Sequence, residues 1–108
     1  MTNVVVISGR LVADAKKIDR QTKEKNFTIV NFSLAHNHNK EKSSFFDVVF
    51  YGEHANAIHQ YLTKGKEVVV TGHLVQNSWK DGDKTLYRVI IEAHSIDLHS
   101  DVSSNLQR

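Results

Sequence analysis

The sequence predicts an all-β domain: a five-stranded Greek-key barrel with one short α-helix between strands 3 and 4. Three observations carry the prediction. Five segments have the β-branched or alternating residues of strands, one segment after the third has helical spacing instead, and 108 residues leave room for one modest core. Five glycines and no proline interrupt the chain little, so its strands can be long and curved. A small closed barrel suits this order of elements.

Three strands are expected before the helix. Residues 4–11 form a β-branched run, residues 27–35 alternate between apolar and polar side chains, and residues 45–51 alternate again. Two polar segments separate these strands. Residues 13–26 are rich in lysine and are expected to form an exposed loop or hairpin tip, and residues 36–44 are expected to form a mobile loop.

One helix is expected after the third strand, because the spacing of apolar residues changes at Gly52. Ala55, Ile58 and Leu62 recur at intervals of three and four residues, the period of one helix face. Gly65 follows where a glycine commonly ends a helix. The pattern predicts a helix of about two to three turns.

Two long strands, residues 67–79 and 85–98, complete the predicted barrel. Residues 80–84 join them and contain an Asp-Gly pair, which is a strong hairpin signal. The domain is therefore expected to cover residues 1–99. Residues 100–108 have no core-forming pattern and are expected to be a short flexible tail.

Composition excludes several classes of protein. The chain has no cysteine, so it contains neither disulfides nor thiolate metal sites. No basic leader with a cleavage site precedes the first strand, and no apolar run approaches the roughly 20 residues of a membrane helix. We expect a cytoplasmic protein.

Residues 10–42 carry eight basic and four acidic residues, a net charge of +4, whereas residues 43–108 carry a net charge of −2. A locally basic region is compatible either with a polyanionic partner or with an ordinary solvated surface.

Aromatic side chains stand where the pattern predicts exposure. Phe46, Val48 and Phe50 form the expected core face of the third strand, so Phe45 and Tyr51 point outward.

Trp79 and Tyr87 flank the polar hairpin instead of lying in an apolar run. An exposed ring on a curved sheet can stack on a base, whereas lysine and arginine can neutralise phosphates. Lys80, Lys84 and Arg88 are the basic candidates beside this hairpin. Burial in a subunit interface, under a loop or against the hairpin is the alternative role for the aromatic rings.

Five stretches of the chain, in unbroken order, resemble bacterial single-stranded DNA-binding proteins. The resemblance covers about residues 3–98, and no single motif is diagnostic by itself. The matching stretches are residues 3–11 (NVVVISGRL), 30–35 (VNFSLA), 45–52 (FFDVVFYG), 61–65 (YLTKG) and 68–74 (VVVTGHL).

The resemblance implies an OB-fold that binds single-stranded DNA without sequence specificity during replication, recombination or repair, associated with the nucleoid. It places Phe45, Tyr51 and Trp79 at base-stacking positions and Lys64 at a basic position. Arg10, in the first matching stretch, is a further basic candidate. The family usually forms homotetramers, so a homotetramer is expected here, with a dimer as the alternative. Strand pairing around residues 4–7 could join two copies. Stacking and backbone contacts tolerate any sequence, so we expect little base specificity.

The sequence also departs from the family pattern. A further stacking tryptophan is replaced near Lys40, and Asp47 stands where the family can have arginine. Several basic positions before Trp79 are Val75, Asn77 and Ser78 in this chain. These changes predict weaker or differently tuned DNA binding. The long tail whose acidic tip recruits repair and replication proteins is missing, so we expect no recruitment through such a tip.

Other functions are less well supported. His36 and His38 lie close in sequence, but no third ligand has recognisable spacing, so we predict neither a metal nor another cofactor. No nucleophile stands beside a base and no glycine-rich phosphate loop precedes a helix, so we predict a protein without enzymatic activity. Two alternatives remain open. One is a primosomal accessory protein of the same fold that binds a helicase and DNA, and the other is a barrel whose outward aromatics bind a protein.

Overall fold

The fold is a closed β-barrel with three projecting arms, in a computed structural model that describes residues 1–21, 23–24 and 26–98. Its strands, in chain order, are β1 Val5–Leu11, β2 Lys16–Gln21, β3 Asn26–Asn37, β4 Ser43–Tyr51, β5 Glu67–Asp81 and β6 Lys84–Leu98. The helix α1 (Glu53–Ile58) and a 3₁₀ turn η1 (His59–Tyr61) connect β4 to β5.

Five of these strands close the predicted barrel. Neighbouring strands follow the order β1, β5, β6, β4, β3, and β1 pairs with β3 at Arg10 and Leu11 to complete the ring. All pairings are antiparallel except β4 with β6, where Val48 lies opposite Ile91 in a parallel pair. The predicted five-stranded Greek-key barrel with a helix between the third and fourth barrel strands is confirmed.

Alternating apolar side chains fill the barrel because every second residue of a strand points inward. The most completely buried large side chains come from all five barrel strands and from the connection after α1: Leu11, Val30, Leu34, Val48, Leu62, Val68, Val70 and Ile91. The predicted core face of β4 is confirmed, since Val48 and Phe50 are buried and Phe46 packs against the core. No helix of the described residues is long and apolar enough to cross a membrane.

Both segments expected to be loops contain more strand than predicted. In the segment 13–26, β2 pairs with β3 as one hairpin, although every β2 side chain is exposed. Backbone hydrogen bonds hold this hairpin together. They do not depend on side-chain type, so β2 has no alternation of apolar and polar residues from which it could be predicted. In the segment 36–44, β3 and β4 continue to Asn37 and Ser43, and the N–H of His38 donates to the carbonyl of Lys42 across the tip.

The helix is also shorter than the sequence suggested. Its α-helical part ends at Ile58, η1 adds one turn, and Gly65 occupies a later turn with a φ of 85°. The expected tail, residues 100–108, lies outside the described residues.

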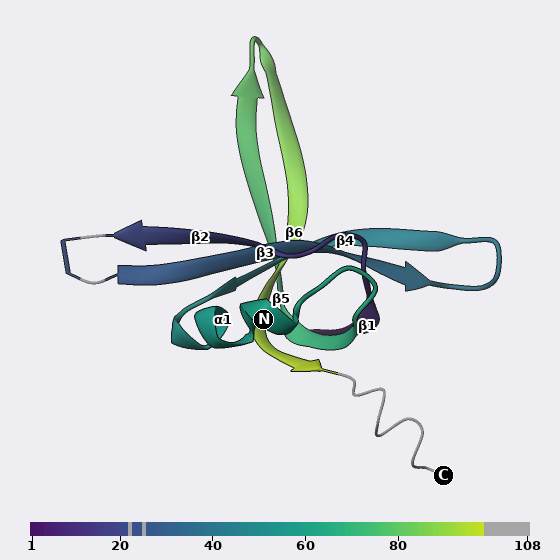
Figure 1. The fold of residues 1–108 in the computed structure, drawn as a ribbon. Helices are drawn as coiled ribbons and strands as arrows, with labels where there is room; N and C mark the ends of the chain where they lie inside the picture. The colour runs from purple at the N-terminus through teal and green to yellow at the C-terminus, as the bar shows by residue number, and fades with distance from the viewer. Residues whose placement is uncertain (22, 25, 99–108) are drawn as a thin grey trace.

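The three arms leave the barrel in different directions (Figure 1). The β5–β6 hairpin stands upright, the β2–β3 and β3–β4 hairpins extend to opposite sides, and α1 lies below them. The upright hairpin that the Asp-Gly pair predicted is present, and its two turn residues are Gly82 and Asp83, between the paired Asp81 and Lys84. Gly82 has a φ of 65°, which suits a two-residue turn with glycine in first place.

Candidate nucleic-acid interface

The three aromatic residues predicted to stack all lie on the outer side of the sheet. Phe45 and Tyr51 alternate with the core residues of β4 and are 67% and 44% exposed. Trp79 lies on the part of β5 that extends beyond the barrel, and it is 47% exposed. Alternation along β5 places Trp79 on the side opposite to the buried Val70.

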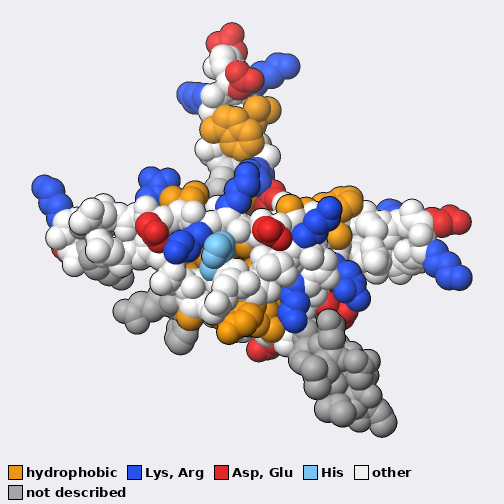
Figure 2. All heavy atoms as spheres, in the orientation of Figure 1, with side chains coloured by type: hydrophobic (Ala, Val, Ile, Leu, Met, Phe, Trp, Pro, Cys, Tyr) orange, Lys and Arg blue, Asp and Glu red, His pale blue; other side chains and the backbone are white. Residues whose placement is uncertain are grey.

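A groove runs between the β3–β4 sheet and the base of the upright hairpin, with a volume of about 480 Å³. Its polar lining comes from five strands and from the connection between β1 and β2: Asp14, Lys16, Asn31, Ser33, Asp47, Asn77 and Arg88. Figure 2 shows lysine and arginine side chains around the base of this hairpin and on the arms, with an apolar patch on the hairpin itself. The strand that carries Phe45 and Tyr51 therefore also forms one wall of the groove.

An ion pair spans this groove. The guanidinium of Arg88 on β6 donates from Nε to Asp47 Oδ2 on β4 at 2.9 Å, and its Nη2 donates to the same oxygen. From β3, the Ser33 hydroxyl donates to Asp47 Oδ1 at 2.7 Å. Burial raises the pKa of Asp47, but the hydrogen bonds from Ser33 and Arg88 and the charge of Arg88 outweigh it, so this pKa lies below its ordinary value of 3.8.

Arg10 and Lys64 meet at one end of the barrel, beside Gly65. Arg10 donates from Nη1 to the carbonyl of Gly65 and from Nη2 to Glu67 Oε1, both at 3.0 Å. The backbone N–H of Lys64 donates to the Asp14 carboxylate, which fixes the backbone there, and the Lys64 side chain is exposed. Arg10 lies opposite Ala35, which lies opposite Phe45, so this basic end continues across the sheet to the first aromatic.

The site residues predicted on the β5–β6 hairpin lie on two opposite sides of that hairpin. Cross-strand pairing places Lys84 and Arg88 on the side that carries Trp79. Lys80 and Tyr87 lie on the other side, where Tyr87 is 62% exposed. The structure therefore brings Trp79, Lys84 and Arg88 together and separates them from the remaining two.

Sequence reasoning predicted Arg88 as a site residue, but it did not predict most of the other polar residues that line the groove. Lys16 belongs to the unpredicted strand β2, and the alternation of β3 identifies Asn31 and Ser33 only as solvent-facing. Nothing in the local sequence of Asn77 marks it as a groove residue. The outward parity of Asn31 and Ser33 is the one signal that could have placed them beside Asp47, which faces Ser33 across β3 and β4.

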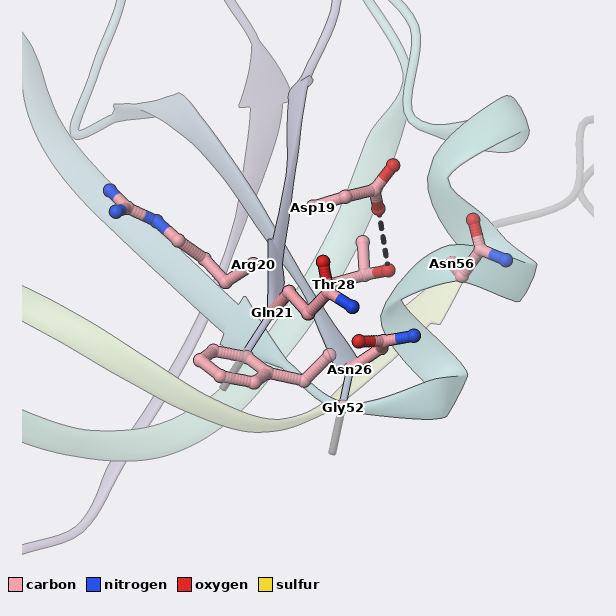
Figure 3. Close-up of a pocket in the computed structure, with 8 residues that line it drawn as sticks. Asp19, Arg20, Gln21, Asn26, Thr28, Gly52 and Asn56 are labelled. Carbon is pink, nitrogen blue, oxygen red and sulfur yellow. Dashed lines mark hydrogen bonds between the residues drawn. The ribbon is translucent and has the colours of Figure 1, made fainter. Parts of the chain in front are cut away.

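A second hollow lies under the β2–β3 hairpin, against α1 (Figure 3). The Thr28 hydroxyl donates to the Asp19 carboxylate in this hollow (Figure 3). The amide oxygen of Asn56 on α1 accepts a hydrogen bond from Lys17 of β2. Thr28 shares the parity of the buried Val30, so this hollow lies on the side of the sheet opposite Tyr51. It is not part of the aromatic surface.

The histidines make local contacts. His36 Nδ1 lies 2.7 Å from the carbonyl oxygen of Ser8, and His73 Nδ1 lies 2.7 Å from His94 Nε2. Within residues 1–21, 23–24 and 26–98, no three histidine, cysteine or acidic side chains gather in an arrangement that could hold a metal ion.

Comparison with known proteins decides the family. The profile of the single-strand binding protein family matches residues 2–99. The chain belongs to this family. A single-stranded DNA-binding protein of Borreliella burgdorferi is 33% identical over 115 residues, which cover 97% of this chain and 74% of that protein. Its counterpart in Treponema pallidum is 33% identical and covers 98% of this chain, and this chain spans 62% of that protein. Another in Aquifex aeolicus is 33% identical over 91% of this chain and 70% of its own length.

The family resemblance drawn from the five sequence stretches is thereby confirmed. The barrel order and the parallel β4–β6 pair supply the fold that the resemblance implied. Family membership does not test the roles of individual site residues, which therefore stay predictions.

Proposed function

We propose that this member of the single-strand binding protein family binds single-stranded DNA through the outer face of its barrel. The observation that carries the proposal is the exposure of Phe45, Tyr51 and Trp79 on the outer side of one continuous sheet. Stacking on such rings is worth about 1–3 kcal/mol per base and tolerates any sequence. Binding of this kind protects single strands during replication, recombination or repair in the cytoplasm, and it requires no catalytic group.

Lysines supply most of the phosphate attraction in this proposal. Lys16, Lys64 and Lys84 are exposed, and none forms an ion pair within the described part of the chain. Lys80 is also exposed, but it lies on the side of the hairpin opposite Trp79. Arg10 and Arg88 face carboxylates instead, which offset their charges. Each lysine that neutralises a phosphate on a single strand adds about 0.7 to the slope of log affinity against log salt.

The testing experiment is a titration of Trp79 fluorescence with oligo-dT at low and high salt. Stacking on the indole quenches its emission, and counterion release weakens the binding as salt rises. We expect strong quenching, and we expect high salt to reduce it. Duplex DNA should compete poorly with oligo-dT for the protein. Quenching unaffected by salt would remove the phosphate-binding role of the lysines. No binding even at low salt would instead support a barrel whose aromatics bind a protein.

We also propose that the chain assembles into a homotetramer. Val5 to Gly9 of β1 pair with β5 on one side, whereas pairing with β3 begins only at Arg10. Within the described residues, the second edge of this stretch has no strand partner, and Val4 and Val6 are exposed beside it. An open edge of this kind is a template for pairing with another chain. Light scattering after size exclusion that gives a monomer would contradict the proposal, and a dimer would reduce it to the strand pairing alone.

A further inference from the structure

The Asp47–Arg88 pair presents one unused edge of the guanidinium. A guanidinium has five N–H donors in a planar fork. Arg88 uses its Nε donor and one Nη2 donor on Asp47 Oδ2. Its remaining donors lie on Nη1 and Nη2, side by side along the outer end of the group. No atom of the described residues accepts a hydrogen bond from Nη1, and the Arg88 side chain is 55% exposed.

Three strands hold this edge in place. Asp47 on β4 is fixed from one side by the Ser33 hydroxyl of β3 and from the other by Arg88 of β6. An arginine restrained in this way loses less side-chain freedom when it binds a ligand. The neighbouring carboxylate also repels a phosphate, because Asp47 remains ionised at neutral pH. A neutral ligand with two adjacent acceptors fits this edge better than an anion does.

The ligand chemistry follows from the donor pattern. Two parallel N–H donors match two adjacent acceptors, and guanine offers such a pair in O6 and N7. In a single strand the free Watson–Crick edge of cytosine offers a second such pair in O2 and N3, whereas thymine has no such pair on one edge. Trp79 lies on the same side of the hairpin, one alternate position beyond Asn77, which pairs with Arg88. Alternate residues of a strand lie about 7 Å apart, so a base stacked near Trp79 brings its edge toward Arg88.

Arg10 provides an internal comparison. It also pairs with a carboxylate, but its Nη1 donates to the carbonyl of Gly65 and its Nη2 to Glu67. The outer edge of Arg10 is therefore already occupied by the protein, whereas that of Arg88 is open.

We propose that Arg88, positioned by Asp47, is a base-reading residue that favours guanine over thymine in single-stranded DNA. The proposal rests on the proposed function and refines it, because it predicts a base preference where stacking alone predicts little. In this arrangement Asp47 is a positioning residue and Arg88 contacts the base.

Three oligomers of equal length test the preference by fluorescence titration at one salt concentration. One contains only thymidine, the second carries isolated guanines in a thymidine background, and the third carries 7-deazaguanine at the same places. We expect about fivefold tighter binding of the guanine oligomer, the lower end of a bidentate arginine–guanine contact. The 7-deazaguanine oligomer lacks the N7 acceptor, so its affinity should return close to that of thymidine.

Variants separate the roles of the two residues. Arg88→Lys keeps the charge but loses the fork, so it should abolish the guanine preference while oligo-dT binding persists. Asp47→Asn should also abolish the preference, and it should strengthen oligo-dT binding and steepen the salt dependence because Arg88 becomes free for phosphate. Arg10→Gln is the matched control and should change the affinities for all three oligomers by the same factor. Both Asp47 and Arg88 are at least a third exposed, so circular dichroism should report folded variants.

The outcomes distinguish the two proposals. Equal affinities of the unaltered protein for all three oligomers would overturn the guanine preference and leave single-strand binding intact. A guanine preference that persists in Asp47→Asn would overturn the positioning role of Asp47. Failure to bind any oligomer would overturn the proposed function, and this inference with it.

Discussion

Strands β5 and β6 run through both the barrel and the upright hairpin, yet side chains of the same parity are buried in the barrel and exposed in the hairpin. Within the barrel, Val70 of β5 and Ile91 of β6 are buried. Beyond it the inward parity continues through Val89 and Tyr87, and both are more than half exposed. The alternation is the same in both regions, but in the hairpin no opposite wall covers it. Closure of the ring, not the pattern of a strand, therefore decides which residues are buried.

The largest expected effect is a contrast in stability between identical substitutions in the two regions. Leu34→Ala removes a fully buried side chain of the barrel and should lower the free energy of unfolding by about 2–5 kcal/mol. Leu86→Ala on the hairpin removes a side chain that is 37% exposed and should cost less than about 1 kcal/mol. Urea denaturation of the two variants measures the difference. Equal losses would mean that the hairpin belongs to the same packed core.

This contrast also shows how far the sequence was informative. Strand-forming residue patterns identified all five barrel strands, and alternation placed Val48 and Phe50 inside and Phe45 outside, as the structure confirms. It missed β2, because the exposed side chains of that strand carry no period.

The pairing of Asp47 with Arg88 was equally out of reach from the sequence. The two residues are 41 positions apart, and they meet only because β4 and β6 pair in parallel at Val48 and Ile91. Local periodicity contains no information about such a register. The groove residues therefore depend on the folded chain, whereas the outward aromatics could be read from single strands.

The next effect compares the two sides of the hairpin. Trp79→Ala removes a ring on the side that carries Arg88 and should weaken oligo-dT binding by about 1–3 kcal/mol. Tyr87→Ala removes a ring from the other side and should leave the affinity almost unchanged. Anisotropy of a labelled oligomer reports both variants without relying on tryptophan emission. A larger loss for Tyr87→Ala than for Trp79→Ala would move the DNA path to the opposite side of the hairpin.

A smaller effect on stability distinguishes Gly82, which is required by its backbone conformation, from Gly9, which is required by lack of space. Gly82 has a φ of 65°, and no atom lies within 4 Å of the place a Cβ would take, so Gly82→Ala should cost about 1 kcal/mol from backbone strain alone. Gly82→Asn should recover part of that loss, since asparagine tolerates this conformation. At Gly9, a Cβ would collide with the carbonyl oxygen of Ala35, so asparagine should be worse than alanine there. Thermal unfolding of the four variants checks whether the order of alanine and asparagine reverses between the two sites.

The smallest effect is the pH dependence of the Asp47–Arg88 pair. Because the pKa of Asp47 is lowered by folding, its contribution to stability is complete above the ordinary value of 3.8 and is lost as pH falls through the folded value. The pair is partly exposed, so solvent screening limits the contribution to less than about 1 kcal/mol. The difference in unfolding free energy between the unaltered protein and Asp47→Asn should therefore be small at neutral pH and should shrink in acid. Ser33→Ala removes one hydrogen bond that lowers this pKa, so the acid-dependent loss of stability should be smaller in that variant and should be complete at a higher pH. An acid response that Ser33→Ala leaves unchanged would show that Arg88 alone sets the ionisation of Asp47.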